Sequence, residues 1–390
     1  MPDGLILVKT AGEKTLVAFL QDGMLMEYHQ QDDSSESLVG AIFLGRVERV
    51  LPQVKAAFVK LGLKQNGFLP IREQEGYHQL MGDSPLITGT DVLVQVKKDP
   101  KGDKGAFLTR DVALPGQYVL LMPNNRHIGV SKRIEDESDR AAAKALGKKL
   151  ADGRFGLIVR HAALFARESD IRDEAEALYE GWKSLADSAP FRKAPELLHT
   201  PDSPLSALVR DYSARYNLTV LADGDIPGAE RIPPEEMDLL WRRSKVEHQL
   251  KQALGRKVDT PGGGNLMIDQ REALHTIDVN SASNVETRDG MSLPLSQNLS
   301  AVSEIARQIR LRNLSGIVLV DFIDMDTEAE RQAVLAAMED AVRDDRVKTV
   351  IHGFTRLGIL EMTRKRTSDT LLEMMSAPCK HCGGCGHFPL

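Results

Sequence analysis

The sequence predicts an α+β protein of several domains, and three observations support this class. Its 390 residues correspond to two or three domains at roughly 150 residues each. Between residues 39 and 119, short apolar stretches broken by Gly and Pro predict a small Greek-key barrel. Towards the C-terminus, apolar strands alternate with amphipathic helices, which predicts parallel strands joined by a right-handed crossover.

The composition excludes several classes of protein. Hydrophobic residues make up 42% and charged residues 27%, which excludes disordered, collagen-like and coiled-coil chains. The 50 Lys and Arg against 56 Asp and Glu give a net charge of −6, so any nucleic-acid binding needs local basic patches. The N-terminus lacks a secretory signal, and every apolar run is far below the ~18 residues of a membrane span. We therefore expect a cytoplasmic protein that does not contact membranes.

The first two segments follow from their strand patterns. Residues 1–38 predict a hairpin with strands at Leu5–Val8 and Leu16–Leu20. Residues 39–119 predict a barrel such as an OB-fold, with Phe58 on one strand and Phe68 on the next.

The surface of this barrel suggests contact with nucleic acid. Its strands are followed by a basic, glycine-containing loop that includes Lys104. Aromatic side chains beside such a loop can stack bases and attract phosphates. The alternative is that both phenylalanines belong to the core and that the lysines are merely solvated.

The middle of the chain mixes helices and strands, first over residues 120–203 and then over residues 204–262. The expected elements are helices at Glu135–Ala151, at Asp170–Ala186 and from Glu235 to about Gly255, and a strand at Gly156–Arg160. The glycine turn at Pro261–Gly264 is not followed by Lys-Ser/Thr, which excludes a Walker phosphate loop.

Two aspartates on expected strands of residues 263–378 carry the strongest chemical signal. Strand alternation places Asp278 and Asn280 on one face. Asp321 lies inside a nearly continuous apolar run, which is typical of a strand buried on both faces, and a lone carboxylate there is costly unless it is protonated, hydrogen-bonded or bound to a cation. Two such aspartates can hold Mg²⁺, which completes its shell with water and phosphate oxygens. Asn280 could then hold a carboxylate, the attacking water or the phosphate.

A purely structural role is the alternative for these residues. Asp278 would then cap a turn, Asp321 would join a buried hydrogen-bond network, and Asp324 would be a loop residue that could at most support the site. Two further basic groups are candidates for contact with a nucleic-acid backbone. They are Arg307, Arg310 and Arg312 on a helix at Ser300–Asn313, and Arg364, Lys365 and Arg366. Each group could equally be a solvated surface.

All three cysteines lie near the C-terminus. This clustering indicates a local cysteine site in a cytosolic protein, because a disulfide framework would spread its cysteines along the chain. Cys379 and Cys382 form a Cys-x-x-Cys knuckle that can bind structural Zn²⁺. Because zinc takes four ligands, one chain could close the site with Cys385 and His387, although that spacing is cramped. The remaining alternative is unliganded thiols.

A series of stretches, in order along almost the whole chain, shares the motifs of one known family. They are Lys55-Ala-Ala-Phe-Val59 with Gly67-Phe-Leu-Pro70, Leu121-Met-Pro-Asn-Asn125 with Ser131-Lys-Arg-Ile-Glu135, Gly156-Leu-Ile-Val-Arg160, Thr276-Ile-Asp-Val-Asn-Ser-Ala282, Glu304-Ile-Ala-Arg-Gln-Ile-Arg-Leu-Arg312, Val320-Asp-Phe-Ile-Asp-Met325 and Cys379-x-x-Cys382. In these stretches the chain resembles the ribonuclease E/G family of bacterial endoribonucleases.

The resemblance implies a domain order. It implies an RNase H-like layer at residues 1–38 and 204–262, an OB-fold RNA-binding insert at 39–119, a 5′-sensor domain at 120–203, a DNase I-like catalytic subdomain at 263–378 and a zinc-binding linker at 379–390. In the family two chains share one zinc, which implies a homodimer and leaves higher assemblies open. The chain resembles the short members, so we expect no scaffold tail for degradosome partners.

The resemblance also implies an activity. Family members cut single-stranded, A/U-rich RNA with Mg²⁺ during rRNA and mRNA processing and decay, leaving 5′-phosphate and 3′-hydroxyl ends. At the matching positions Asp278 and Asp321 would hold Mg²⁺, and Asn280 would support Asp278 and the substrate. The implied RNA contacts in the barrel are Phe58, Phe68 and Lys104. The alternatives are a non-catalytic RNA-binding protein on a nuclease scaffold and a metal-dependent DNase.

The pocket that reads a 5′-monophosphate in the family matches only in part. Gly116 and Arg160 are present, but His161 replaces a Thr and Lys348 replaces a second Arg. Lysine cannot make the forked phosphate contact of arginine, whereas histidine can donate to phosphate. The pocket could persist with an altered preference or could have decayed; alternatively, Arg160 and His161 are ordinary exposed strand residues.

Overall fold

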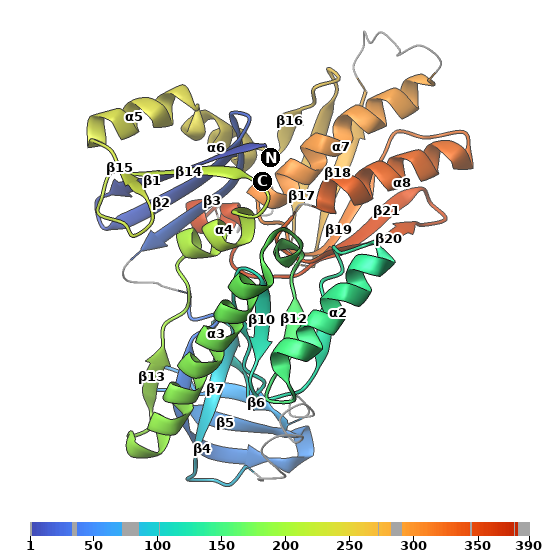
Figure 1. Cartoon of the computed structure of the whole chain (residues 1–390). Helices are drawn as coiled ribbons and strands as arrows, with labels where there is room; N and C mark the ends of the chain where they lie inside the picture. The colour runs from blue at the N-terminus through green and yellow to red at the C-terminus, as the bar shows by residue number, and fades with distance from the viewer. Residues whose placement is uncertain are drawn as a thin grey trace. The chain divides into compact units, whose positions relative to one another are not determined.

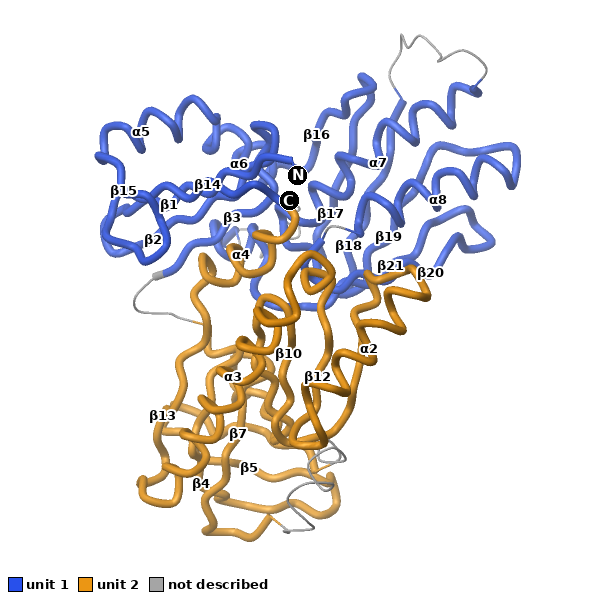
Figure 2. Tube along the Cα trace, in the orientation of Figure 1, with its two compact units in different colours: residues 1–35, 216–390 blue, residues 36–215 orange. Residues whose placement is uncertain are grey.

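The structure, a computed structural model, describes residues 2–32, 37–71, 86–100, 102–271, 273–281, 291–343, 345–377 and 379–380. These residues form a mixed α+β protein, as predicted, which divides into two compact units (Figure 2). Unit 1 comprises residues 1–35 and 216–390, and unit 2 comprises residues 36–215. Among the described helices, none is long and apolar enough to cross a membrane.

The first sheet of unit 1 has five strands in the order β15-β14-β1-β2-β3 (Figure 1). They are β1 (Asp3–Ala11), β2 (Lys14–Gln21), β3 (Met24–Asp32), β14 (Asn217–Ala222) and β15 (Glu230–Arg231). Helices α5 (Pro234–Arg243) and α6 (Val246–Leu254) bury Met237, Trp241 and Leu250 in the core that includes this sheet.

Two features of this sheet differ from the expectation. The predicted N-terminal hairpin gains a third strand, β3, whose sequence is too polar to show an apolar strand pattern. The long helix expected from Glu235 is instead the two helices α5 and α6. Lys245 between them has a positive φ of 50°, a left-handed conformation that an α-helix cannot continue through.

The second sheet of unit 1 has six strands in the order β16-β17-β18-β19-β21-β20. Helices α7 and α8 cover one of its faces (Figure 1) and bury Ile277, Val318 and Val334. β18 and β19 are parallel, as predicted, but β21 pairs antiparallel between β19 and β20. The elements are β16 (Lys257–Asp259), β17 (Asn265–Gln270), β18 (Leu274–Asn280), α7 (Leu293–Leu311), β19 (Gly316–Asp321), α8 (Glu328–Arg343), β20 (Thr349–Phe354), β21 (Ile359–Arg364) and α9 (Leu371–Met375).

Unit 2 contains a closed five-stranded barrel, as predicted for residues 39–119. Its order is β4-β5-β6-β8-β7, and pairing of β4 with β7 closes it. The strands are β4 (Ile42–Leu51), β5 (Ala56–Lys60), β6 (Gly67–Pro70), β7 (Asp91–Lys98) and β8 (Phe107–Thr109), with β13 (Glu196–His199) added beside β4. Val47, Val59 and Leu108 are fully buried in its core.

The rest of unit 2 is a four-stranded sheet, β11-β12-β10-β9, with helices packed against it. Helix α2 begins after Asp136, whose side chain accepts a hydrogen bond from the Asp139 backbone N–H, as an N-cap should. The elements are β9 (Leu114–Pro115), β10 (Val119–Met122), β11 (Ile128–Val130), α2 (Glu137–Ala151), β12 (Gly156–Val159), α3 (Glu168–Ser188) and α4 (Pro204–Tyr212).

Candidate functional site

Asp278 and Asp321 occupy paired positions on two neighbouring parallel strands. In the register of β18 with β19, Asp278 is the direct partner of Asp321. Both residues are exposed, whereas Ile277 and Val320, one position earlier on each strand, are buried in the core with α7 and α8. The two carboxylates therefore lie on the sheet face that the helices leave open, as strand alternation predicts for Asp278. The expected burial of the Asp321 strand on both faces was wrong, because only alternate residues of β19 are buried.

Asn280 supports the first of these aspartates. Its Nδ2 donates a hydrogen bond to Oδ2 of Asp278 at 2.9 Å. This contact is one of the roles that the sequence left open for Asn280. It restrains the orientation of the Asp278 carboxylate.

The electrostatics of the pair suit a cation. Burial raises the pKa of Asp321, and the nearby charges of Asp278 and Asp324 raise it further. Within the described part of the chain, no hydrogen bond or ion pair satisfies the Asp321 side chain. Carboxylates that repel one another in this way fit a hard ion such as Mg²⁺. No group of three His, Cys, Asp or Glu suited to a metal occurs among the described residues.

Arg256 adds a cation that the sequence did not reveal. Its Nη2 lies 2.7 Å from Oδ2 of Asp269 on β17. The pKa of Arg256 is raised first by its contact with Asp269, and Asp278 contributes to the same shift. This exposed guanidinium therefore lies within electrostatic reach of the carboxylate pair, where it could contact a phosphate. No motif surrounds Arg256, so sequence reasoning had no signal for it.

Asn298 on α7 holds the segment that follows β19. Its Nδ2 donates to the Ile323 carbonyl oxygen at 2.8 Å, and its Oδ1 accepts from the Ile323 backbone N–H at 3.0 Å. The Asn298 side chain is fully buried. Because Ile323 lies between Asp321 and Asp324, the two hydrogen bonds fix the backbone that carries both carboxylates.

The basic side predicted for the helix at 300–313 is buried and does not face solvent. Arg307, Arg310 and Arg312 are only 7%, 5% and 1% exposed. Arg307 donates to Glu304 on its own helix and to the backbone oxygen of Leu25 on β3. The predicted contact of these arginines with a nucleic-acid backbone was wrong, because α7 packs against β3 as well as β17 and β18.

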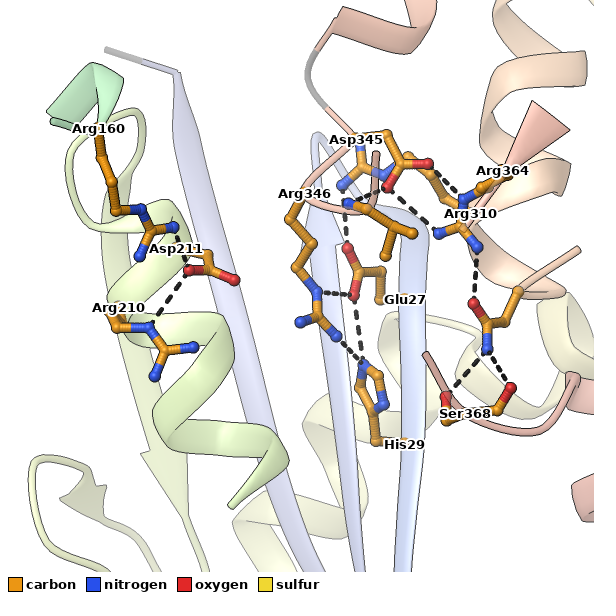
Figure 3. Close-up of polar contacts among 12 residues, drawn as sticks. Glu27, His29, Arg160, Arg210, Asp211, Arg310, Asp345, Arg346, Arg364 and Ser368 are labelled. Atoms are coloured by element: carbon orange, nitrogen blue, oxygen red, sulfur yellow. Dashed lines mark hydrogen bonds and ion pairs between the residues drawn. The ribbon is translucent and has the colours of Figure 1, made fainter. Parts of the chain in front are cut away.

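The prediction for Arg364 was wrong for a similar reason. Its Nε donates to Oδ2 of Asp345 at 2.6 Å, and the two side chains are nearly inaccessible to solvent. Figure 3 shows this pair beside a second cluster, in which Arg346 pairs with Glu27 at 2.8 Å and Arg310 lies 3.5 Å from the same carboxylate. These ion pairs join parts of unit 1.

Phe58 and Phe68 lie side by side on the barrel. They are paired residues of β5 and β6, with ring centroids 6.0 Å apart. Both rings are half-buried, so neither belongs wholly to the core. Lys104 is exposed in the turn that precedes β8. The arrangement is compatible with base stacking, and the role of the three residues stays a prediction.

In the predicted phosphate pocket, the guanidinium of Arg160 is already bonded to other groups of the protein. It donates through Nη1 to the carbonyl oxygen of Gly116, and its Nη2 lies 2.6 Å from Oδ1 of Asp211 on α4 (Figure 3). The backbone beside Gly116 is also occupied. The carboxylate of Glu174 accepts hydrogen bonds from the backbone N–H groups of residues 117–119. The protein's own carboxylates thus satisfy the main anion-binding groups of this region.

The other two predicted pocket residues belong to different units. His161 follows Arg160 and begins a short 3₁₀ helix, with its ring 5.3 Å from that of Phe165. Lys348 belongs to unit 1, where it is exposed just before β20. Their role in reading a phosphate stays a prediction.

Of the predicted zinc ligands, Cys379 is exposed and forms no disulfide with a described residue. Cys382, Cys385 and His387 lie outside the described residues. The zinc site therefore stays a prediction.

Comparisons with known proteins agree with the motifs. The model of the ribonuclease E/G family matches residues 113–367, which include both aspartates. Ribonuclease G of Salmonella typhimurium is 36% identical over 98% of this chain and 83% of its own length. Ribonuclease G of Escherichia coli K12 is 35% identical over the same shares. Ribonuclease E of Nostoc is 36% identical over 90% of this chain and 54% of its own length.

Proposed function

The chain belongs to the ribonuclease E/G family, and from this premise we propose that it is a Mg²⁺-dependent endoribonuclease of single-stranded, A/U-rich RNA. Membership of the family makes it a ribonuclease of RNA processing, and we extend this to rRNA and mRNA processing and decay. The observation that carries the proposed chemistry is the paired register of Asp278 and Asp321, with Asn280 bonded to the first.

Asp278 and Asp321 would hold the metal ion at the open face of the sheet. When bound, Mg²⁺ lowers the pKa of a water ligand and offsets charge on the phosphoryl oxygens. Asn280 keeps the Asp278 carboxylate oriented, and Asn298 fixes the backbone after Asp321. In the hydrolysis a water oxygen bonds to phosphorus and the P–O3′ bond breaks. The 3′ oxygen leaves as a hydroxyl, and the other product carries the 5′-phosphate.

The barrel would bind the substrate, with Phe58 and Phe68 stacking bases and Lys104 contacting phosphate. Such stacking needs unpaired bases, which supports the choice of single-stranded RNA. Because Arg160 is paired with Asp211, we expect only a weak preference for a 5′-monophosphate.

We also propose the assembly and location that the motifs imply. Cys379 and Cys382 of two chains would share one structural Zn²⁺ and form a homodimer in the cytoplasm. Cys379, the proposed ligand that the structure describes, is exposed, and a residue at such an interface must be exposed before the two chains assemble.

The rival proposal is an RNA-binding protein without catalysis. A protein that only binds RNA has no use for two aspartates, Asp278 and Asp321, that repel one another in paired positions, or for an Asn280 amide bonded to the first of them. The presence of all three residues in working positions favours the enzyme.

The decisive experiment is a cleavage assay on A/U-rich RNA with Mg²⁺ and with EDTA. We expect cleavage that requires Mg²⁺ and that falls at least 100-fold in both Asp278→Asn and Asp321→Asn. Asp340→Asn is the matched control, because this aspartate is exposed on α8 and, among the described residues, pairs with Arg343 of its own helix. Binding of RNA without cleavage under every condition would leave the rival proposal standing.

A further inference from the structure

A single row of five side chains crosses the barrel, one from each strand. In the strand registers Arg49 of β4 pairs with Phe58, Phe58 pairs with Phe68, Phe68 with Phe107, and Phe107 with Lys98 of β7. Paired residues of neighbouring strands present their side chains on the same face of a sheet. The barrel therefore carries three adjacent phenyl rings with a cation at each end.

The rings are spaced so that each can receive its own base. The centroids of Phe58 and Phe68 are 6.0 Å apart, and those of Phe68 and Phe107 are 5.8 Å apart. The rings are inclined by 68° and 42°, so no ring lies flat on its neighbour, and all three are half-buried. This spacing exceeds the rise of about 3.4 Å per nucleotide in a stacked strand. An RNA that follows the row must therefore be extended and its bases unstacked from one another.

The charges around the row complement such a strand. Arg49 and Lys98 are exposed at its two ends, and the Lys98 Nζ lies 5.5 Å from the Phe107 centroid. The carboxylate of Asp99, which follows Lys98, accepts hydrogen bonds from the Leu38 backbone N–H and from the Ser37 hydroxyl. Surfaces that bind single-stranded RNA combine aromatic rings, on which bases stack, with cations that attract the phosphate backbone, and this row has both.

We propose that this row binds three consecutive bases of single-stranded RNA, with a third stacking position on Phe107 and phosphate contacts from Arg49 and Lys98. The inference rests on the proposed ribonuclease function and extends its binding surface by one nucleotide beyond Phe58 and Phe68. It also gives the barrel selectivity for single strands, since paired bases cannot separate to meet the rings.

The test places a fluorescent reporter in the row. In Phe107→Trp the new indole is half-exposed, whereas Trp182 and Trp241 are 9% and 2% exposed and should respond little. An oligouridylate of about ten nucleotides is titrated with EDTA present to prevent cleavage, and binding is followed in parallel by the anisotropy of a labelled copy. We expect the Trp emission to be quenched in step with binding.

The matched control for the reporter is Phe191→Trp, at an aromatic position of unit 2 that is 90% exposed and outside the row. Its emission should not change when RNA binds. RNA binding with unchanged emission from Phe107→Trp overturns the third position while leaving the ribonuclease function intact. If the emission of Phe107→Trp changes with protein concentration when no RNA is present, the row is not an RNA site but a contact with a second copy of the chain. Absence of both RNA binding and cleavage in the unaltered protein overturns the proposed function itself.

The cations are tested by the salt dependence of binding. Each phosphate contact contributes about 0.7 to the slope of log K against log salt for single strands. Arg49→Gln and Lys98→Gln should each make the slope less steep by about that amount. The control Lys148→Gln, on the exposed side of α2, should leave the slope unchanged. Phe107→Ala should weaken binding about tenfold without changing the slope. Unchanged slopes in both Gln variants overturn the assigned phosphate contacts.

Discussion

Two asparagines act on the carboxylate pair in different ways. Asn280 donates a hydrogen bond to the Asp278 carboxylate, so it acts directly on one of the two proposed metal ligands. Asn298 touches only the backbone of Ile323, so it acts through the position of the segment that carries Asp321 and Asp324. A positioning residue of this kind should alter how well the ion is held more than how fast a fully loaded site reacts.

We therefore expect Asn298→Ala to raise the Mg²⁺ concentration for half-maximal cleavage about tenfold, with a much smaller loss of kcat at saturating Mg²⁺. The loss of two buried hydrogen bonds should also lower the free energy of unfolding by about 2 kcal/mol. Gln249→Ala is the matched control, because Gln249 is also buried and its side-chain amide bonds the Leu25 backbone N–H and the Gly23 carbonyl oxygen. It should lower stability without changing the Mg²⁺ requirement, and an equal shift in both variants would count against positioning by Asn298.

Asp211 pairs with Arg160, the residue that we propose as a contact for a 5′-phosphate. An Arg–carboxylate pair at 2.6 Å competes with phosphate for the same donors. We expect Asp211→Asn to increase the ratio of cleavage rates for 5′-monophosphate over 5′-hydroxyl RNA by about threefold to tenfold. Asp202→Asn, which removes the neighbouring partner of Arg210, should leave the ratio unchanged. A strong 5′-monophosphate preference in the unaltered chain would contradict this view of Arg160.

At the scale of elements, α7 joins the two sheets of unit 1. Near its start it carries Asn298, and near its end it buries Arg307 against Leu25 of β3 and Arg310 beside Glu27. Arg346, just before β20, completes the charge cluster around Glu27 (Figure 3). A change in the cluster should therefore affect the stability of both sheets together.

The cluster predicts a defined pH dependence. Burial opposes ionisation of Glu27, but Arg346, His29 and Arg310 together hold its pKa well below the usual value. The stabilisation from Glu27 is thus complete above about pH 4.5 and is lost as the pH falls towards the folded-state pKa. Urea unfolding should show Glu27→Gln less stable by about 3 kcal/mol at pH 7, with a flatter pH dependence below pH 4.5. The exposed Glu339→Gln on α8 should match the unaltered protein at every pH.

The elements also show where sequence reasoning succeeds and where it stops. Strand alternation was sufficient to place Asp278 and Asn280 on one face, because that period is a property of a single strand. It could not show that Arg307 is buried, because the polar face of a helix looks the same whether it meets water or a second sheet. The break at Lys245 was also hidden, since nothing in its neighbours marks a left-handed residue.

At the scale of the whole molecule, the barrel and the parallel pair of β18 and β19 were predictable because each is built from consecutive segments of the chain. The five-stranded sheet was less so, because β1 pairs in parallel with β14 across the entire insert of unit 2. Only the family resemblance brought residues 1–38 together with residues 204–262. Pairings between distant segments leave no periodic signal in either segment.

The assembly of whole molecules is tested by counting zinc and mass together. If two chains share one ion through Cys379 and Cys382, the purified protein should be a dimer with one zinc per two chains. Cys379→Ser should then give zinc-free monomers, and Cys385→Ser should remain a zinc-bound dimer. A monomer with one zinc, sensitive to both substitutions, would mean that Cys385 and His387 close the site within a single chain. A protein without zinc that is unaffected by either substitution would mean that these thiols are unliganded.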